Sequence, residues 1–290
     1  MKEKIDECDV LVLGCAGMLG SSVLKYFYEK GKYRVFGTCR GSNIPERLTN
    51  LSENIIKGVD AEVDGVVEEV FRGCKPSVVI NCIGVVKQLD SSDDPLVAIP
   101  INSLLPHKLS RLCKLVGARL VHISTDCVFS GIKGGYREGD ASDAMDLYGR
   151  SKLLGEVTSR NSITLRTSII GHENGSSHSL LEWFLSRKGS VKGFTKAVFS
   201  GLPTVELARV IHDYVIPLSE LSGLYHVSAD PINKFELLGL IAKEYGATTV
   251  IEPDDKLVID RSLDSNRFQH ATGFLPHKWP QMIKLMHEFN

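Results

Sequence analysis

The sequence lacks two features that would each place it in a particular class of protein. It has no surplus of positive charge, because 34 lysines and arginines are balanced by 35 acidic residues, leaving a net charge of −1. A chain that holds nucleic acid through its phosphates is therefore not expected. It also has no apolar run of about 18 residues that could span a bilayer, and its first residues carry no apolar stretch typical of a secretion signal. We expect a cytoplasmic protein with neither a nucleic-acid nor a membrane partner.

The cysteines lack a pattern as well. There are seven, and they show no CxxC spacing and mostly lie in apolar runs. Disulfide frameworks and zinc sites depend on even numbers or regular spacings, so we expect reduced thiols and no metal. The content of 43% hydrophobic and 24% charged residues is typical of a soluble globular protein. A length of 290 residues fits one large domain or two closely joined ones.

The first half of the chain alternates apolar runs of strand length with segments of helical period. The expected strands are residues 9–14, 33–38, 77–84 and 119–124, and the expected helices include 61–73 and 103–117. Strands that are apolar on both faces and separated by helices predict a parallel sheet covered on both sides. The fold class is therefore α/β, with a doubly wound parallel sheet of the Rossmann type.

The pattern changes after about residue 170. Loops rich in glycine and serine are followed by a second set of expected elements, which are helices near 203–216 and 233–245, a short strand at 224–228 and a terminal helix from about 279. These elements predict a smaller, mostly α lobe. We therefore divide the chain into a dinucleotide-binding domain over residues 1–170 and a substrate-binding lobe over 171–290, partly interleaved with the first domain.

A glycine-rich turn follows the first expected strand. The stretch GCAGMLG places three glycines between this strand and a helix, in the spacing GxxGxxG. Glycines let the chain turn sharply and let backbone N–H groups at the helix start face a pyrophosphate. A dinucleotide site is therefore predicted, with a purely structural turn as the alternative. The residues expected at the cofactor are Gly14, Ala16, Gly17, Met18, Leu19 and Gly20.

The segment after the second expected strand indicates which dinucleotide binds. An acidic residue there would bind the ribose 2′-hydroxyl and repel a 2′-phosphate. The sequence instead reads FGTCRGSN, with Arg40 as a cation, so NADPH is expected in preference to NADH. Asp60 follows a further expected strand in the stretch IIKGVD, and it is placed to meet the adenine. The alternatives are a solvated charge at Arg40 and an ordinary turn residue at Asp60.

Tyr148 and Lys152 form a second motif, in the stretch DLYGRSKLLGE. Their i, i+4 spacing places both on one face of a helix. A phenol titrates near pH 10, and an ammonium beside it stabilises the phenolate and brings the phenol closer to proton transfer at neutral pH. Thr125 lies 23 residues before Tyr148 at a strand end, where its hydroxyl is able to hold the same carbonyl oxygen. The three residues predict ketone reduction with Tyr148 as the proton donor.

Taken together, the glycine turn, NCIG, STDCVFSG and YGRSK resemble an extended short-chain dehydrogenase/reductase, in particular the dTDP-4-dehydrorhamnose reductases and their sugar-nucleotide relatives. The resemblance covers nearly the whole chain. It implies a catalytic triad of Thr125, Tyr148 and Lys152, with Lys152 also reaching the nicotinamide ribose. It further implies that Cys82, Ile83 and Gly84 line the cofactor together with Tyr148 and Lys152.

The resemblance also implies a sugar-nucleotide site in the C-terminal lobe and at the strand ends. Two of the residues assigned to it have ordinary alternatives, since Trp183 fits a core position and Arg261 fits a loop ion pair. The residues expected at the substrate are Val86, Lys87, Asn102, Asp126, Trp183, Ser200, Gly201, Pro203 and Arg261.

Cys127 stands where the resembling reductases usually have a tyrosine. The simplest interpretation is a small residue that fills part of the tyrosine's space. A second interpretation is that the thiol and a histidine epimerise the sugar next to the ketone, as in epimerase/reductases of similar sequence. His178 is the better positional match for that histidine and His172 the fallback. A third is that the thiol only adjusts the position of the substrate.

The function expected from these residues is NADPH-dependent reduction of the C4 ketone of a dTDP- or UDP-linked 4-keto-6-deoxyhexose, in deoxysugar or surface polysaccharide biosynthesis. Two alternatives remain open. One is a bifunctional epimerase/4-reductase that uses Cys127 and His178, and the other is a non-catalytic regulatory subunit that binds a sugar nucleotide. A homodimer is the assembly considered.

Overall fold

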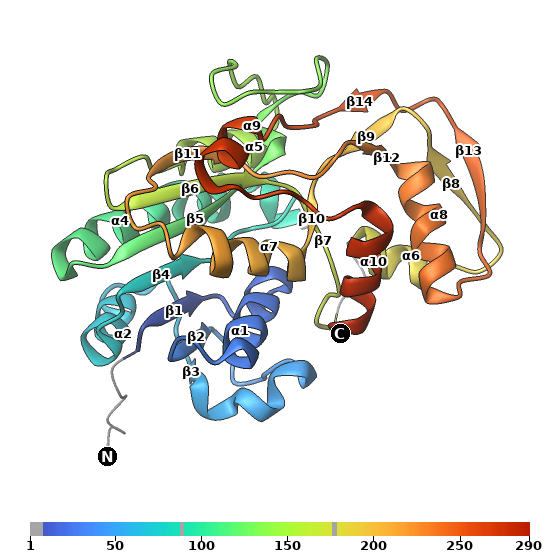
Figure 1. Cartoon of the computed structure of the whole chain (residues 1–290). Helices are drawn as coiled ribbons and strands as arrows, with labels where there is room; N and C mark the ends of the chain where they lie inside the picture. The colour runs from blue at the N-terminus through green and yellow to red at the C-terminus, as the bar shows by residue number, and fades with distance from the viewer. Residues whose placement is uncertain (1–7, 88–89, 176–178) are drawn as a thin grey trace.

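The computed structural model describes residues 8–87, 90–175 and 179–290. Its centre is a seven-stranded sheet in the order β11-β6-β5-β4-β1-β2-β3, in which every neighbouring pair is parallel (Figure 1). The strands are β1 (Val10–Leu13), β2 (Val35–Cys39), β3 (Ile55–Lys57), β4 (Val78–Asn81), β5 (Arg119–Thr125), β6 (Ser162–Thr167) and β11 (Gly223–His226). The predicted doubly wound parallel sheet is confirmed.

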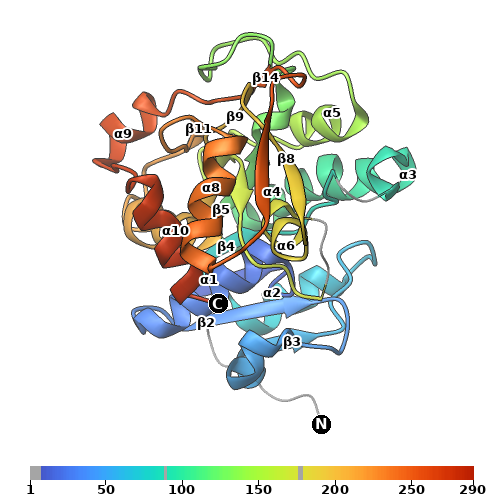
Figure 2. The same ribbon diagram turned by 90° about the vertical axis from the view of Figure 1, so that its right-hand side faces the viewer.

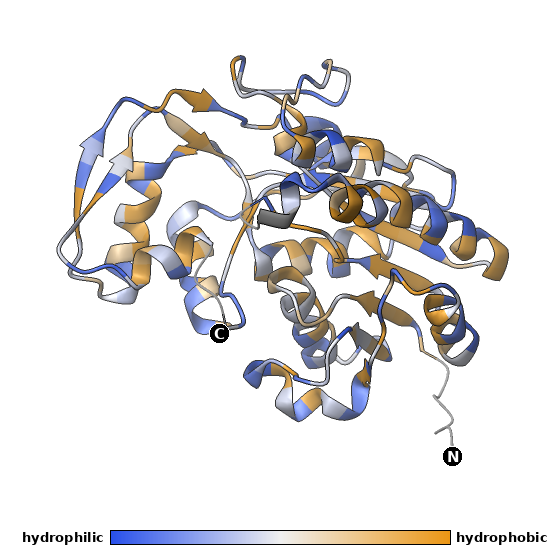
Figure 3. Ribbon diagram, turned by 180° about the vertical axis from the view of Figure 1, so that it is seen from behind, coloured by the Kyte–Doolittle hydropathy of each residue, from blue (hydrophilic) through white to orange (hydrophobic). Residues whose placement is uncertain are grey.

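Helices cover both faces of this sheet. Val10 and Val12 of β1 enter one buried cluster, and Leu11 and Leu13 enter another, because side chains alternate between the faces of a strand. Helices α1 (Met18–Lys30) and α7 (Thr204–Val210) pack on the first face, and α2 (Val66–Cys74) and α4 (Leu105–Val116) pack on the second. Figure 3 accordingly shows long hydrophobic stretches within the strands of the sheet.

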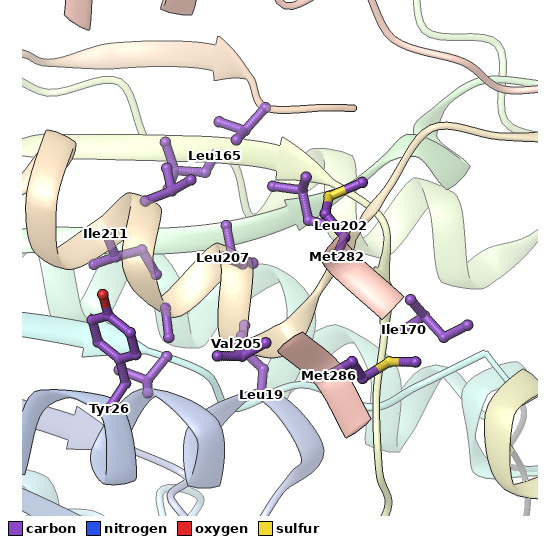
Figure 4. Packing of buried hydrophobic residues seen from close by; sticks show 14 of the residues in the cluster. Leu19, Tyr26, Leu165, Ile170, Leu202, Val205, Leu207, Ile211, Met282 and Met286 are labelled. Carbon is purple, nitrogen blue, oxygen red and sulfur yellow. The ribbon is translucent and has the colours of Figure 1, made fainter. Parts of the chain in front are cut away.

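Two segments from the second half of the chain belong to the sheet layer. Strand β11 pairs with β6 at its edge. Helix α7, which continues into a π-helical turn η5 (Ile211–Val215), packs against α1 and the sheet. Figure 4 shows Val205 and Leu207 of α7 in this layer with Leu19 of α1. The division at residue 170 stays a prediction, and α7 and β11 are the points where the later part of the chain returns to the sheet.

The rest of the second half forms a lobe that faces the viewer in Figure 2. The helices are α6 (Leu180–Leu185), α8 (Lys234–Tyr245), α9 (Asn266–Thr272) and α10 (Trp279–Glu288), and the strands are β7 (Ile169–Ile170), β8 (Ser190–Phe194), β9 (Ala197–Phe199), β10 (Leu202–Pro203), β12 (Ile232–Asn233), β13 (Val250–Asp254) and β14 (Ile259–Asp260). Two of these helices, α8 and α10, match predicted ones closely, and α9 was not predicted. Short strands, which the sequence did not indicate, form three small sheets in the described part of the lobe.

Shorter elements complete the first half of the chain. They are the turns η1 (Glu46–Asn54), η2 (Asp90–Asp93) and η4 (Asp126–Val128), the π-helical segment η3 (Ile99–Leu104), and helices α3 (Pro95–Ala98) and α5 (Leu147–Leu154). The expected helix 61–73 starts only at Val66, because Gly65 before it has a positive φ of 86°. Within the described residues, no helix combines the length and apolarity needed to cross a membrane.

Candidate active site

The predicted cofactor and catalytic segments meet at the carboxyl ends of adjacent strands. Gly14 follows β1, Cys82 follows β4 and Thr125 ends β5, and β4 lies between β1 and β5. The strand order reverses at β1, since the chain runs from β1 to β2 and β3 on one side and then to β4 on the other. Ligands of open α/β sheets bind in the crevice at such a reversal.

The glycine turn has the geometry that a pyrophosphate requires. Gly14 has a φ of +82°, and a Cβ there would lie 3.0 Å from Cγ1 of Ile83. A Cβ on Gly20 would overlap the carbonyl oxygen of Gly14. Helix α1 starts after Gly17 with no side-chain cap and no acidic residue in its first turn, which leaves N–H donors and a partial positive charge for an anion. These residues therefore fit a dinucleotide.

The other residues predicted in this turn have separate roles. Leu19 is buried in the core between α1 and α7, whereas Ala16 and Met18 are partly exposed. Two residues that the sequence analysis missed also reach the turn. The side-chain amide of Asn174 donates to the Ala16 oxygen at 2.9 Å, and Nη2 of Arg47 donates to the Met18 oxygen at 3.1 Å.

Arg47 is a second cation beside the glycine turn. It lies in η1, just after β2, and burial lowers the pKa of its guanidinium to about 10, against the opposing effect of the Glu182 carboxylate. Nη2 also approaches the carbonyl oxygen of His172 at 3.5 Å. The sequence did carry a signal for Arg47, because Arg47 is the second arginine after β2. The sequence analysis, however, considered only Arg40 as the cation in that segment.

Arg40 and Asp60 lie where the sequence places them, at the ends of β2 and β3. Arg40 is exposed directly after β2, whose Thr38 oxygen accepts from the backbone N–H of Cys15 at 2.8 Å, so Arg40 stands beside the glycine turn. The carboxylate of Asp60 accepts from the backbone N–H of Glu62 at 3.0 Å. Contact of Asp60 with adenine stays a prediction, and its own turn already uses the carboxylate.

Tyr148 lies in the first turn of α5. Asp146 caps this helix by accepting from the N–H of Gly149 at 2.7 Å. A Cβ on Gly149 would overlap the carbonyl oxygen of Cys127, so the missing side chain lets α5 approach the end of β5. Burial raises the pKa of the Tyr148 phenol above its usual range, the Cys127 thiol adds to the shift, and a hydrogen bond with the Thr125 hydroxyl opposes it. Tyr148 and Thr125 are thus brought together as predicted, but the pKa of the phenol is raised by burial, whereas the sequence predicted that the Lys152 ammonium would lower it.

Lys152 is buried one turn further along α5. Its Nζ donates to the carbonyl oxygen of Ile123 on β5 at 2.7 Å. A Cβ on Gly84 would lie 3.8 Å from this Nζ, so the lysine also borders the loop after β4. Burial lowers the pKa of Lys152 to about 8, while the Glu156 carboxylate raises it. The ammonium therefore faces the predicted cofactor loop.

Asn102 is fixed behind this lysine by its own hydrogen bonds. Its side chain is 1% exposed and accepts from the N–H of Val85 at 2.9 Å, while its amide donates to the Ser151 hydroxyl at 3.2 Å. It therefore joins the loop after β4 to α5. Asn102 therefore lies at the back of the site, behind Lys152, and its predicted direct contact with the substrate stays a prediction.

The end of β5 opens onto a cluster of charges. Asp126 is buried, which raises the pKa of its carboxyl, while the positive charge of Arg261 lowers it. Arg261 is held by a 2.7 Å hydrogen bond from Nε to the Phe129 oxygen. Lys234, at the start of α8, is close enough to interact with this carboxylate: burial lowers the pKa of its ammonium, and the charge of Asp126 raises it. The sequence gave no signal for Lys234, since its partners lie far away in the chain.

Cys127 sits within this cluster as a protonated thiol. Its backbone N–H donates to the Thr125 hydroxyl oxygen at 3.1 Å. Burial raises the pKa of the thiol to about 12, and the Asp126 carboxylate adds to the shift. Lys87 reaches the same region and pairs with Asp146 at 2.5 Å. A thiol with so high a pKa is a weak proton acceptor at neutral pH.

Of the two histidines predicted as partners of Cys127, the structure describes only His172. His178 lies outside the described residues. His172 has both ring nitrogens engaged, Nδ1 with Glu182 at 2.8 Å and Nε2 with the Tyr245 hydroxyl at 2.9 Å. Burial lowers its pKa, against the hydrogen bond to Glu182. His172 therefore ties its loop to α6 and α8.

The remaining predicted substrate residues divide between surface and framework. Val86 is exposed. Trp183 packs against the main hydrophobic cluster, with the Arg187 guanidinium 5.3 Å from its ring centre. Ser200, Gly201 and Pro203, in the loop around β10, are buried. The hydroxyl of Ser200 accepts a 3.0 Å hydrogen bond from the N–H of Leu263. The contacts of these predicted residues with substrate stay predictions.

Comparison with known proteins gives a consistent set of relatives. Residues 8–288 match the protein family described as the RmlD substrate binding domain. The spore coat polysaccharide biosynthesis protein SpsK of Bacillus subtilis is 28% identical over 95% of both chains. The dTDP-4-dehydrorhamnose reductase of Aggregatibacter actinomycetemcomitans is 24% identical over 95% of this chain and 97% of its own.

Two further matches extend this set. Methionine adenosyltransferase 2 subunit beta of Xenopus laevis is 31% identical, but over only 50% of this chain and 41% of its own. Among solved structures, the Bacillus anthracis dTDP-4-dehydrorhamnose reductase in complex with NADP has a TM-score of 0.78 at 20% identity, covering 97% of this chain and 99% of that one.

Proposed function

The chain belongs to the RmlD substrate binding domain family, and from this membership we propose that it reduces the C4 ketone of a nucleotide-linked 4-keto-6-deoxyhexose with NADPH. The single observation that carries the proposal is the convergence of Thr125, Tyr148 and Lys152 at the carboxyl ends of the strands, beside a glycine turn that fits a dinucleotide. The predicted family and the predicted class of NAD(P)-dependent oxidoreductase are both confirmed by the relatives.

Each of the three residues has a distinct part in the proposed reduction. When bound, the nicotinamide supplies a hydride to the carbonyl carbon. Tyr148 gives its proton to the carbonyl oxygen, and because burial raises the pKa of the phenol, that proton is present throughout the physiological range. Thr125 holds the same oxygen through its hydroxyl. The ammonium of Lys152, on the same face of α5, stabilises the phenolate that remains.

The choice of sugar nucleotide is a finer part of the proposal. The Aggregatibacter relative is named for a dTDP-linked 4-keto sugar, and the Bacillus subtilis relative is named for polysaccharide biosynthesis. The first name supports a dTDP-sugar as the substrate, and the second supports a role in building a polysaccharide. Arg261 and Lys234 support an anionic substrate, since both cations face the open end of β5.

Two other functions are weighed against this one. The epimerase/reductase needs Cys127 to remove a proton, and the raised pKa of its thiol, about 12, argues against that role. The half-length match to methionine adenosyltransferase 2 subunit beta, a protein named as a subunit, is the finding that bears on the alternative of a non-catalytic subunit. A complete set of Thr125, Tyr148 and Lys152 favours the enzyme, because a binding-only protein needs no proton donor.

One assay in heavy water tests the function and separates the first two candidates. We expect the full chain to oxidise NADPH with dTDP- or UDP-linked 4-keto-6-deoxyhexoses and to give a product without carbon-bound deuterium at C3 or C5. The physical reason is that the Cys127 thiol stays protonated and removes no proton from carbon. Mass spectrometry of the product is the measurement, and the 4-keto sugar without enzyme supplies the background exchange.

Other results of this assay would contradict specific parts of the proposal. Deuterium above the background that disappears in Cys127→Ser, with reduction intact, would establish the epimerase/reductase. Absence of NADPH oxidation with every sugar of the panel, together with tight binding of a sugar nucleotide, would establish the regulatory subunit.

The cofactor preference gives a second prediction. We expect NADPH to bind more tightly than NADH, and Arg40→Ala to narrow that gap by about 1.5–3 kcal/mol, the value of a charge-assisted hydrogen bond to a 2′-phosphate. Fluorescence titration with both cofactors measures it. Arg72→Ala is the matched control, because Arg72 lies near the end of α2, at the opposite edge of the sheet. At that end the carbonyl oxygen of Cys74 accepts a hydrogen bond from the backbone N–H of Cys8, just before β1. Equal affinities of the unmodified chain for NADPH and NADH would refute the assignment.

A further inference from the structure

Helix α5 (Leu147–Leu154) and Glu156, two residues beyond its end, contact two successive residues of β5. Nζ of Lys152 donates to the carbonyl oxygen of Ile123 at 2.7 Å. Four residues after Lys152, the carboxylate of Glu156 accepts from the hydroxyl of Ser124, also at 2.7 Å. Thr125 is the next residue of the strand. The two contacts therefore fix the helix that carries Tyr148 relative to the strand end that carries Thr125.

Arg166 of β6 holds the same carboxylate from the other side. Its Nε and Nη2 bond the two carboxylate oxygens of Glu156, each at 2.6 Å, and the side chains of the pair are 4% and 7% exposed. The third nitrogen, Nη1, lies 3.3 Å from Nε2 of His226 on β11. The guanidinium also lies 5.2 Å from the ring centre of Phe129, two residues beyond Cys127. Arg166 thus connects the catalytic helix to the loop after β5.

Stability alone does not account for this ion pair. Removing two charges from water costs several kcal/mol per ion, and a buried pair often contributes no more than well-packed apolar side chains would. This pair is buried and bidentate, and its Glu156 follows α5 closely in the chain and contacts Ser124, the neighbour of Thr125. This position next to β5 and α5 indicates that the negative charge of Glu156 influences the catalytic residues Lys152 and Thr125.

We propose that Glu156, held in place by Arg166, is a positioning residue that sets Tyr148 against Thr125 and keeps the buried Lys152 protonated. This inference rests on the proposed function for its catalytic consequence. Glu156 itself touches neither substrate nor cofactor, and it acts through Ser124 and Lys152.

The charges around Lys152 support this role. Burial lowers the pKa of Lys152 to about 8, and the Glu156 carboxylate is the first group that opposes the shift. The Cys82 thiol also faces the lysine, but burial raises its pKa to about 12, so it is neutral at pH 7. Burial and the charge of Lys152 hold the pKa of His122 on β5 well below its usual range, so it too is neutral. The Tyr148 phenol, on the same helix, is kept protonated by burial.

The test is the substitution Glu156→Gln in the full chain with saturating NADPH. Gln has nearly the same shape and still accepts from Ser124, but it carries no charge. Lys152 must be protonated for the proposed reaction, so activity falls above its pKa. We expect the alkaline limb of the kcat profile to move to lower pH by roughly 1–2 units, the effect of losing one close opposite charge. At pH 8 about half of Lys152 is protonated in the unmodified chain, so the rate is expected to fall by about 5- to 50-fold.

A second readout keeps the test independent of the substrate. The titration of Lys152 is followed by NMR of protein labelled with ¹³C at the lysine Cε, and its signal is assigned by its loss in Lys152→Arg. Its midpoint is expected to move down with the kcat limb. This measurement stands even if the chain reduces none of the sugars tested, so failure of the proposed function and failure of this inference are distinguishable.

Two companion variants separate charge from folding. Glu156→Gln leaves a buried arginine without its full partner, so the double variant Glu156→Gln/Arg166→Met removes both charges. We expect a downward shift in it that is smaller than in Glu156→Gln, because the positive charge of Arg166 is lost as well. Glu252→Gln is the matched control, because Glu252 pairs with Lys192 on the exposed face of the lobe at 2.5 Å, and the profile should not change. A lower melting temperature with an unchanged Lys152 midpoint and an unchanged kcat limb would overturn the inference and leave the pair a structural one.

Discussion

Replacement of Tyr148 by phenylalanine is expected to lower the rate of ketone reduction by about 10²–10⁴-fold, the usual contribution of a positioned acid. The ring of phenylalanine fills the same partly buried space in the first turn of α5, so the fold and the glycine turn should be unaffected. Only the proton that the phenol gives to the carbonyl oxygen is lost. NADPH affinity should therefore remain close to that of the unmodified chain.

Stopped-flow oxidation of NADPH measures the rate, and fluorescence titration measures the affinity. Tyr28→Phe is the matched control, because Tyr28 is 48% exposed on α1 and its hydroxyl has no part in the proposed reaction. An unchanged rate in Tyr148→Phe would remove Tyr148 as the proton donor. A rate that falls only in proportion to a loss of NADPH binding would assign the residue to the cofactor site alone.

Replacement of Gly149 by alanine is the second change with a large expected effect. The added Cβ would overlap the carbonyl oxygen of Cys127, so the first turn of α5 must move away from the end of β5. Tyr148 moves with it and no longer meets Thr125. A displacement of about 1 Å in a catalytic group costs on the order of 10²-fold in rate. Overpacking at such a contact costs about 1–3 kcal/mol of stability.

Gly239→Ala is the matched control for this change, since Gly239 also lies within a helix, α8, and a Cβ there meets nothing within 4 Å. Alanine is expected to stabilise the chain there by about 0.5–1 kcal/mol. Urea unfolding and kcat are measured for both variants. Full activity in Gly149→Ala would show that the close approach of α5 to Cys127 is dispensable for catalysis.

The alternation of strands and helices in the first half of the chain could be predicted from local sequence, and the structure confirms it. The stretch DVLVLG is apolar at every position that becomes β1, which marks a strand buried on both faces. The helices predicted near 233–245 and from about 279 are α8 and α10. The glycine turn and the i, i+4 pair of Tyr148 and Lys152 are likewise local patterns, because each depends on a few consecutive residues and on the period of one helix.

The fate of the second half of the chain could not be predicted in the same way. The expected helix at 203–216 appears as α7 and η5, but it covers the main sheet beside α1. The expected strand at 224–228 appears as β11 and joins the same sheet next to β6. Whether an amphipathic segment packs on one layer or another depends on the apolar surface left open by distant parts of the chain, and its own sequence carries no such information.

The sequence by itself thus determined the fold class, the family, and the residues that carry the proposed proton transfer and cofactor turn, because these follow from patterns within short segments. Only the tertiary structure decided which charges surround them. Glu156 forms an ion pair with Arg166, the charge of Asp126 acts on Lys234, and Arg47 donates a hydrogen bond to the glycine turn. The physical reason is that a pKa and an ion pair depend on distances through space, and folding sets those distances between residues that are far apart in the chain.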